Sequence, residues 1–249
     1  DIAIAFLLAF ITAFVITPYS IRLAKKVGAV DYPNDRRVNK KPMPRLGGIA
    51  VIAGFLVSAI YLIITMRIEN NIDFITDGLG KKLLGFLFGA MVLGITCYID
   101  DVKGISPLVK LAGQLIAAII VVSCGVRIDN FTIPFKENSI MINEVISYIL
   151  TIGWIVGITN AINLIDGLDG LSSGITLIAC ISMLIIFSLN ESPLIAIILI
   201  TALAGAIVGF LPYNFNPAKT FIGDVGSNFM GYAISIISIL GVAKTYTAI

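Results

Sequence analysis

Long apolar runs alternate with short polar segments along almost the whole chain. The runs are rich in Ile, Val, Leu, Ala and Gly, and they cover residues 2–17, 47–66, 82–99, 108–126, 144–160, 171–188, 194–211 and 228–243. A helix needs about 20 predominantly apolar residues to cross a bilayer, and each run reaches or approaches that length. The pattern therefore predicts an all-α polytopic membrane protein, in which about eight transmembrane helices form a single domain over residues 1–249.

The composition supports this prediction. The chain has 249 residues, of which 58% are hydrophobic and 13% charged, and its mean hydropathy is +1.00. Soluble domains carry about 25% charged residues, so we expect a lipid bilayer as the surroundings and no nucleic-acid partner. The three cysteines, Cys97, Cys124 and Cys180, lie inside apolar runs without metal-ligand spacing, and we interpret them as small hydrophobic residues.

The connections between the runs divide the charged residues between two sides of the membrane, side A with the N-terminus and side B opposite it. Side B receives residues 18–46, 100–107, 161–170 and 212–227. Eleven Lys and Arg residues lie on or beside side B and six on side A, which places side B in the cytoplasm by the positive-inside rule. On side A, residues 127–143 show a rough two-residue alternation that predicts a small hairpin.

Acidic residues are scattered on side A but clustered on side B, where each cluster touches the end of an apolar run. The side B aspartates are Asp100, Asp101, Asp166, Asp169 and Asp224. Because four segments distant in sequence place their unusual polar groups on one side, we predict a single composite site there. Converging carboxylates repel one another and need a counter-cation. With no histidine in the sequence, an oxygen-rich site favours Mg²⁺ or Mn²⁺ over zinc.

The segment NAINLIDGLDGLSSG, residues 160–174, has the most regular polar spacing. Asn160, Asn163, Asp166 and Asp169 recur every three residues. Residues three apart on a helix lie on adjacent faces and can touch, so the spacing predicts a polar stripe that winds round the end of a span. The alternative is an ordinary helix end, with Asn and Asp as caps and the glycines as breakers.

Three other side B segments carry candidate chemistry. Residues 97–111, CYIDDVKGISPLVKL, place two adjacent carboxylates, Asp100 and Asp101, at a span end. Because neighbouring side chains on a helix point about 100° apart, we predict that these two carboxylates have different partners. YNFNPAKTFIGDVGSNFMGY, residues 213–232, places Asp224 between two glycines at the start of a span. DYPNDRRVNKKPMPRLGG, residues 31–48, is a basic loop that could bind phosphates or simply anchor the protein by its positive charge.

Together these four segments resemble, in order, the motifs of the polyprenyl-phosphate N-acetylhexosamine-1-phosphate transferases, the superfamily that includes the phospho-MurNAc-pentapeptide translocases. The PRLGG ending of the first loop resembles the branch that uses UDP-GlcNAc. The resemblance implies that a lipid phosphate, undecaprenyl phosphate, attacks the β-phosphorus of a UDP-sugar and releases UMP. It further implies Mg²⁺ as cofactor and an active site on the cytoplasmic face of the plasma membrane. A homodimer is possible.

The resemblance also implies roles for individual residues. Asp224 would be the principal Mg²⁺ ligand and Asn163 the second. Asp100 and Asp101 would act in lipid-phosphate handling or metal positioning, and Lys110 would contact a phosphate. The residues that would hold the nucleotide are Gly167, Leu168, Asp169, Asn214 and Phe221, with Phe221 stacking on uracil. We add Arg45 to the donor-binding residues and Asp166 to the catalytic acids.

The chain departs from the family pattern in two ways. Asn39 stands where family members usually carry histidine, and the family's His-rich loop near the C-terminus lies beyond Ile249. We therefore expect the chain to be a fragment of a protein with 10 or 11 helices. The alternatives left open are a phospho-MurNAc-pentapeptide translocase, a transporter or channel, a membrane prenyltransferase with Asp-rich loops, and a non-catalytic scaffold. Intramembrane acids also mark ion pathways, but transporters usually place them near the midplane.

Overall fold

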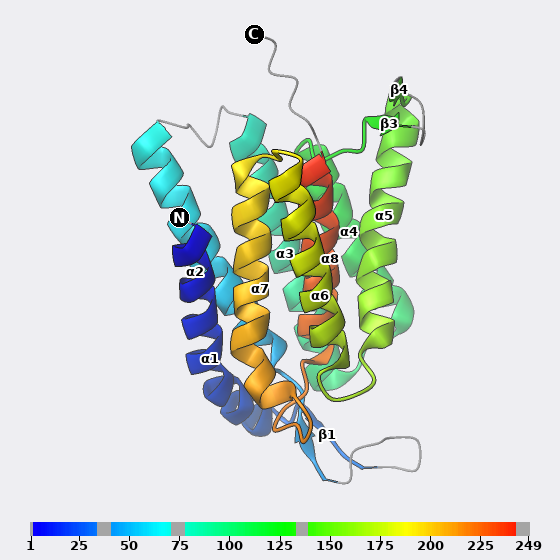
Figure 1. Ribbon diagram of the computed structural model, residues 1–249. Helices are drawn as coiled ribbons and strands as arrows, with labels where there is room; N and C mark the ends of the chain where they lie inside the picture. The colour runs from blue at the N-terminus through cyan, green and yellow to red at the C-terminus, as the bar shows by residue number, and fades with distance from the viewer. Residues whose placement is uncertain (1, 34–40, 71–77, 133–138, 243–249) are drawn as a thin grey trace.

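Eight helices run up and down through the computed structural model, which describes residues 2–33, 41–70, 78–132 and 139–242 (Figure 1). They are α1 (Ile2–Val27), α2 (Gly48–Asn70), α3 (Gly78–Lys103), α4 (Pro107–Ser123), α5 (Glu144–Ile165), α6 (Leu171–Leu189), α7 (Leu194–Asn214) and α8 (Gly223–Val242). Each apolar run of the sequence corresponds to one helix. The predicted all-α membrane architecture is confirmed.

Seven of these helices are long and apolar enough to cross a membrane, and α4 is the exception. It has 17 residues, which at about 1.5 Å per residue extend over roughly 25 Å, a little less than the apolar thickness of a bilayer. The predicted span of 108–126 was too long at its C-terminal end. Gly125 has φ +94°, a left-handed conformation that ends the helix before the apolar run ends.

Several helices continue beyond their apolar runs into segments that the sequence pattern assigned to side B connections. Helix α1 continues for ten residues past position 17, with Ser20 and Ala24 buried and Lys25 and Lys26 exposed. Helix α8 begins at Gly223, five residues before its apolar run. Half of the candidate site residues therefore lie on helix ends and not in loops: they are Asp100, Asp101, Lys110, Asn163, Asn214 and Asp224.

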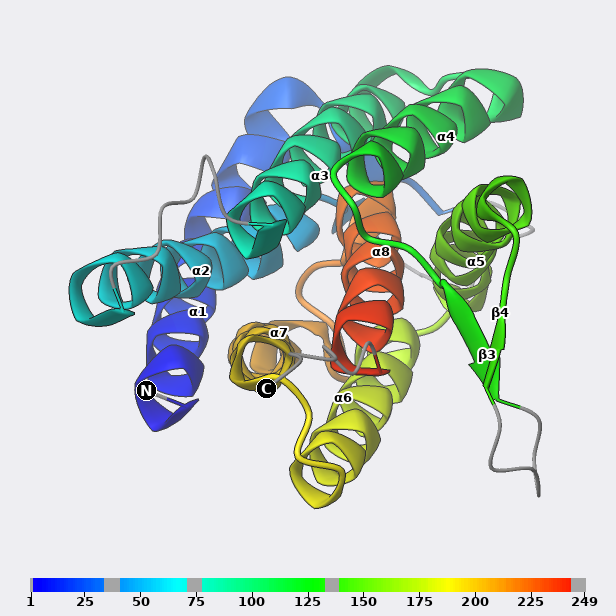
Figure 2. The same ribbon diagram turned by 90° about the horizontal axis from the view of Figure 1, so that it is seen from above.

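Helices α7 and α8 form the interior of the bundle. In the most apolar stretch of α8, 89% of the residues are buried, compared with 22% in α1. Figure 2 shows α8 with α3, α5, α6 and α7 around it. Helix α1 packs on α2 and α7 through small residues: Ala5, Ala9 and Ala13 recur every four positions and are fully buried. Small residues let helix backbones approach closely, which is how membrane helices commonly associate.

Two short hairpins lie at opposite ends of the bundle (Figure 1). Strands β1 (Val30–Asp31) and β2 (Met43–Pro44) are antiparallel and lie at the lower end in Figure 1, which we call the site end. Strands β3 (Asn130–Thr132) and β4 (Ser139–Met141) confirm the hairpin predicted within 127–143. The four predicted side B segments all meet at the site end. Asn39 lies outside the described residues.

Candidate active site

The PRLGG segment brings Arg45 to the start of α8. Main-chain hydrogen bonds join it to the segment before that helix: the N–H of Gly47 donates to the carbonyl of Phe221 (3.0 Å), and the N–H of Gly48 donates to that of Ile222 (2.7 Å). A Cβ at Gly48 would collide with the backbone of Gly226. Glycine is therefore required where the hairpin presses against α8, which gives a physical reason for the end of this motif.

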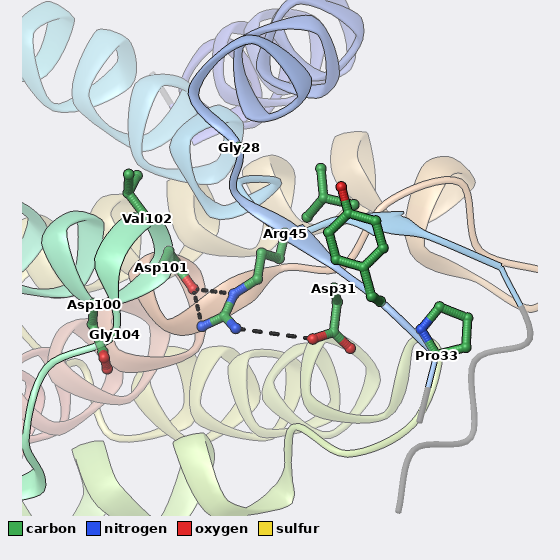
Figure 3. Close-up of a pocket in the computed structure, with 10 residues that line it drawn as sticks. Gly28, Asp31, Pro33, Arg45, Asp100, Asp101, Val102 and Gly104 are labelled. Atoms are coloured by element: carbon green, nitrogen blue, oxygen red, sulfur yellow. Dashed lines mark hydrogen bonds and ion pairs between the residues drawn. The ribbon is translucent and has the colours of Figure 1, made fainter. Parts of the chain in front are cut away.

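Asp101 connects Arg45 to the N-terminus of α8. Its side chain is fully buried, and its two oxygens accept hydrogen bonds from the N–H groups of Asp224 (3.0 Å) and Val225 (2.9 Å). The Arg45 guanidinium contacts the same carboxylate through two nitrogens: Nε donates a hydrogen bond at 2.9 Å, and Nη2 lies 2.8 Å from the same oxygen (Figure 3). A carboxylate at a helix N-terminus satisfies unpaired N–H groups and the helix dipole. Asp101 therefore positions Arg45 and α8.

Asp224 receives side chains from three other elements. Its Oδ1 is 2.5 Å from Lys110 Nζ and accepts a hydrogen bond from Asn163 Nδ2 at 2.6 Å, while its Oδ2 is 3.2 Å from Arg45 Nη2. Lys110 Nζ also donates to Asn163 Oδ1 at 3.1 Å and lies 3.3 Å from Asp100 Oδ2. The two adjacent aspartates of α3 thus have different partners, as predicted from their angular separation.

Three of the five side B aspartates therefore form the predicted composite site with other side chains, whereas Asp166 and Asp169 have their hydrogen bonds elsewhere. We call it the charged cluster, and its members are Arg45, Asp100, Asp101, Lys110, Asn163 and Asp224. Its three carboxylates face two side-chain cations, so the chain itself supplies much of the positive charge that we expected from a metal ion. Within the described ranges, no group of three or more His, Cys, Asp or Glu side chains is placed to hold a metal.

The donor chemistry of the cluster nevertheless fits a hard cation. Asp224 and Asn163, the two residues predicted to bind Mg²⁺, present a carboxylate and an amide oxygen to the same point, and Asp100 adds a second carboxylate there. Oxygen donors of this kind suit Mg²⁺ or Mn²⁺. The ammonium of Lys110 lies among these oxygens.

An amide cluster of buried Gln114, half-buried Asn160 and buried Asn228 lies one helical turn deeper in the bundle. Gln114 Nε2 donates to Asn228 Oδ1 (2.7 Å), and Asn160 Nδ2 donates to Gln114 Oε1 (2.8 Å). Asn228 Nδ2 donates to the carbonyl of Asp224 at 2.8 Å. Sequence reasoning singled out only Asn160. The signal for the other two was their spacing, four residues after Lys110 and Asp224 and hence on the same helix faces.

The stripe predicted from residues 160–174 is helical only as far as Asn163, because α5 ends at Ile165. Asp166 then accepts a hydrogen bond from Ser172 Oγ at 2.7 Å. Burial raises the pKa of the Asp166 carboxyl to about 6, against the lowering effect of that hydrogen bond. Asp169 accepts hydrogen bonds from Asn216 Nδ2 and from the N–H of Ala218, both at 3.0 Å. Both aspartates therefore anchor connections at the site end.

The other predicted nucleotide residues surround this turn. Asn214 is buried; it accepts a hydrogen bond from Ser173 Oγ at 2.9 Å and donates to the carbonyl of Thr220 at 3.1 Å. Gly167 and Leu168 are exposed, and Phe221 is half-buried. Sequence reasoning missed Phe215, which is 69% exposed beside Gly170 and offers a larger free apolar surface than Phe221.

A polar cavity of about 510 Å³ opens on the other side of Arg45 (Figure 3). Asp31 and Tyr32 from the β1–β2 hairpin line it together with Arg45, Asp100 and Asp101. The carboxylate of Asp31 lies 4.0 Å from Arg45 Nη1. Neither Asp31 nor Tyr32 was a predicted site residue. They reach the site because the hairpin folds against the end of α3, a contact between segments distant in sequence.

Comparison with known proteins places these features in a known family. Residues 83–242 match the family described as Glycosyl transferase family 4. The chain is 43% identical to the probable undecaprenyl-phosphate N-acetylglucosaminyl 1-phosphate transferase of Bacillus subtilis, over 99% of the chain and 64% of that protein. It is 35% identical to the decaprenyl-phosphate N-acetylglucosaminephosphotransferase of Mycobacterium tuberculosis, over 92% and 57%. It is 34% identical to the phospho-N-acetylmuramoyl-pentapeptide-transferase of Staphylococcus epidermidis, over 95% and 74%. The chain thus spans less than two thirds of the length of the first two.

Proposed function

Because the chain belongs to glycosyl transferase family 4, we propose that the protein transfers N-acetylglucosamine 1-phosphate from UDP-GlcNAc to undecaprenyl phosphate. The single observation that carries this proposal is the charged cluster, where the β1–β2 hairpin and four helices bring two cations and three carboxylates together at one end of a multi-pass membrane protein. The resemblance of PRLGG to the UDP-GlcNAc branch supports the choice of donor.

Such a transfer needs positioned charge more than it needs a strong base. A phosphate monoester has a second pKa of roughly 6, so the lipid phosphate is largely dianionic at neutral pH. One of its oxygens attacks the β-phosphorus of the UDP-sugar, the bond from that phosphorus to the bridging oxygen of UMP breaks, and UMP leaves. Arg45 and Lys110 are placed to neutralise phosphate charge during this displacement. Asp101 is fully buried with both oxygens hydrogen-bonded, which suits positioning and does not suit nucleophilic attack.

We include Mg²⁺ in the proposal, with Mn²⁺ as a substitute. Asp224 and Asn163 would hold the ion, with Asp100 beside them, and the ion would add positive charge at the pyrophosphate.

The nucleotide is assigned to the neighbouring turn. Asp169 fixes the segment around Asn216 and Ala218, and exposed Leu168 and Phe215 offer apolar surface for a flat base. This assignment places uracil beside residues 166–170 and the pyrophosphate at the charged cluster. The excess of Lys and Arg at the site end supports a cytoplasmic active site in the plasma membrane.

The test uses the full-length protein in nanodiscs with undecaprenyl phosphate. Incubation with UDP-GlcNAc and Mg²⁺ should yield undecaprenyl-PP-GlcNAc and an equal amount of UMP, and UDP-MurNAc-pentapeptide should be a poor donor. Preference for the peptide-bearing donor would instead assign the protein to the translocases. Absence of both products from a folded protein would favour a transporter or a scaffold.

A further inference from the structure

Lys110 occupies the position in the charged cluster where a metal ion would be expected. Its ammonium is surrounded by oxygens from three helices: Asp224 Oδ1 of α8 at 2.5 Å, Asn163 Oδ1 of α5 at 3.1 Å and Asp100 Oδ2 of α3 at 3.3 Å. Carboxylate and amide oxygens converging on one point are the ligand set of a hard divalent cation. The side chain is only 16% exposed, so this arrangement is largely shielded from water.

Lys110 and a divalent cation cannot share this position. Mg²⁺ binds its oxygen ligands at about 2.0–2.1 Å, and an ion bound to Asp224 Oδ1 and Asn163 Oδ1 would lie where the ammonium is. Two cations at that separation repel strongly in a site that is mostly screened from solvent. Metal binding therefore requires the ammonium to leave.

The second cation of the cluster is held differently. Arg45 is fixed by the buried carboxylate of Asp101, which it approaches with both Nε and Nη2, so it stays in place if its longer contact with Asp224 is lost. Lys110 has no such anchor: its three oxygen partners are the ones that a metal would claim. A lysine ammonium on a flexible four-carbon stem can move to a new partner, whereas the planar guanidinium of Arg45 is held through two of its nitrogens on Asp101 Oδ1.

We propose that Lys110 is an internal counter-ion. Its ammonium occupies the cation position when no metal is bound, and the side chain moves to pair with a phosphate of the substrate when the metal enters. The pairing of Lys110 with a substrate phosphate rests on the proposed function, whereas the replacement of the ammonium by the metal ion does not. The cluster thus combines a fixed cation, Arg45, with an exchangeable one, Lys110. The exchange keeps a positive charge beside Asp100 and Asp224 both before and after the ion binds.

The first test measures binding of Mn²⁺ to the full-length protein in nanodiscs by electron paramagnetic resonance, without substrate. Lys110→Met keeps the length of the side chain and removes the competitor, so it should tighten Mn²⁺ binding by about tenfold or more, the scale of one neighbouring charge in a partly buried site. Lys103→Met is the matched control, because Lys103 is exposed at the same end and forms no ion pair with a described acidic residue. It should leave the affinity within about twofold, as expected for a screened surface charge.

A third variant locates the ion. Adding Asp224→Asn to Lys110→Met should abolish the gain in Mn²⁺ affinity. Equal affinity of Lys110→Met and wild type, an equal gain in Lys103→Met, or a gain that survives Asp224→Asn would each overturn the proposal.

A second measurement on the wild-type protein does not depend on any variant folding. Acetylation of Lys110 by an amine-specific reagent, quantified by mass spectrometry, should increase several-fold when Mg²⁺ is added, because the ammonium is released from its three oxygens. Labelling of Lys103 should not change. Unchanged labelling of Lys110 at saturating Mg²⁺ would overturn the exchange. A protein that shows the exchange but forms no lipid-linked sugar would reject the proposed function alone.

Discussion

The aspartates at the site end form two groups that are stabilised in different ways. Asp100, Asp101 and Asp224 each lie against Arg45 or Lys110. Asp166 and Asp169 accept hydrogen bonds from a hydroxyl, an amide and a backbone N–H, and neither forms an ion pair with a described lysine or arginine. We call the first group the paired aspartates and the second the turn aspartates.

The difference shows how neighbouring carboxylates acquire separate tasks. A carboxylate that shares a buried site with cations sets the positions and charges of those cations, and removing it leaves them uncompensated. A carboxylate that is held only by neutral donors fixes the shape of a loop. The paired aspartates therefore suit the task of holding cations for the phosphates of the proposed substrates, and the turn aspartates suit the task of shaping a nucleotide pocket. Four substitutions of aspartate by asparagine, which keep shape and remove charge, probe this division.

Asp101→Asn should have the largest effect, and it should act on stability. The change replaces the fully buried carboxylate that pairs with Arg45 by a neutral amide, and it weakens the cap of α8 because an amide presents one oxygen and not two to the N–H groups of Asp224 and Val225. Removal of one partner of a buried ion pair costs about 3–5 kcal/mol. We expect a clear fall in the melting temperature of the purified protein, measured by intrinsic fluorescence. A melting temperature like that of wild type would show that Asp101 does not hold the helix end.

Asp224→Asn should reduce turnover by about a hundredfold or more, as expected when a charged group that organises a phosphoryl-transfer site is lost. Arg45 and Lys110 would lose the carboxylate that they share, and the predicted metal site would lose its main donor. The measurement is kcat across a Mg²⁺ titration, in which the concentration for half-maximal activity should rise. If kcat were unchanged at every Mg²⁺ concentration, Asp224 could not be a central residue of the site.

Asp169→Asn should have a smaller effect and should change binding more than turnover. Both hydrogen bonds go to one oxygen, Oδ2, and the amide oxygen of asparagine can accept them too, but it loses the charge that strengthens the contacts with Asn216 and Ala218. A charge-assisted hydrogen bond contributes roughly 1.5–3 kcal/mol, so we expect KM for UDP-GlcNAc to rise about tenfold with kcat nearly unchanged. A fall in kcat at constant KM would move Asp169 to the group of paired aspartates.

Asp166→Asn should have the smallest effect, and its sign should depend on pH. Since burial raises the pKa of Asp166 to about 6 in the folded protein, folding favours the protonated carboxyl. That contribution to stability is complete below the unfolded pKa of about 3.9 and is lost as the pH rises through the folded value. Asparagine does not ionise and can still accept the hydrogen bond from Ser172.

The variant should therefore be more stable than wild type at pH 8, where folding has to keep the buried carboxylate ionised, and nearly equal to it below pH 4. Melting temperatures of both proteins between pH 4 and pH 8, without divalent cations, would show this. A variant that is less stable at pH 8 would mean that the charged form of Asp166 stabilises the fold.

Much of the fold could be predicted from the sequence, because apolar length alone decides which segments cross a bilayer. The helix ends could not be predicted as well. Helix α8 extends back to Gly223 because Asp101, far away in the sequence, accepts hydrogen bonds from its first N–H groups. Helix α4 is shorter than its apolar run because Gly125 turns the chain. In both cases, contacts or backbone geometry overrode the hydropathy pattern.

The sequence by itself determined which residue types would meet. The spacing of polar residues at the span ends identified the aspartates and Asn163, and the alternation of the spans placed them on one side. The family resemblance, and not the spacing, pointed to Lys110, and Arg45 was added to the donor-binding residues from the basic loop that contains it. Only the tertiary structure decided the pairs: Asp101 with Arg45 and the start of α8, and Asp224 with Lys110 and Asn163. It also revealed the amide cluster and the place of Asp31. The physical reason is range. Hydropathy acts along one segment, whereas a hydrogen bond of about 3 Å requires atoms from different helices to be brought together by packing.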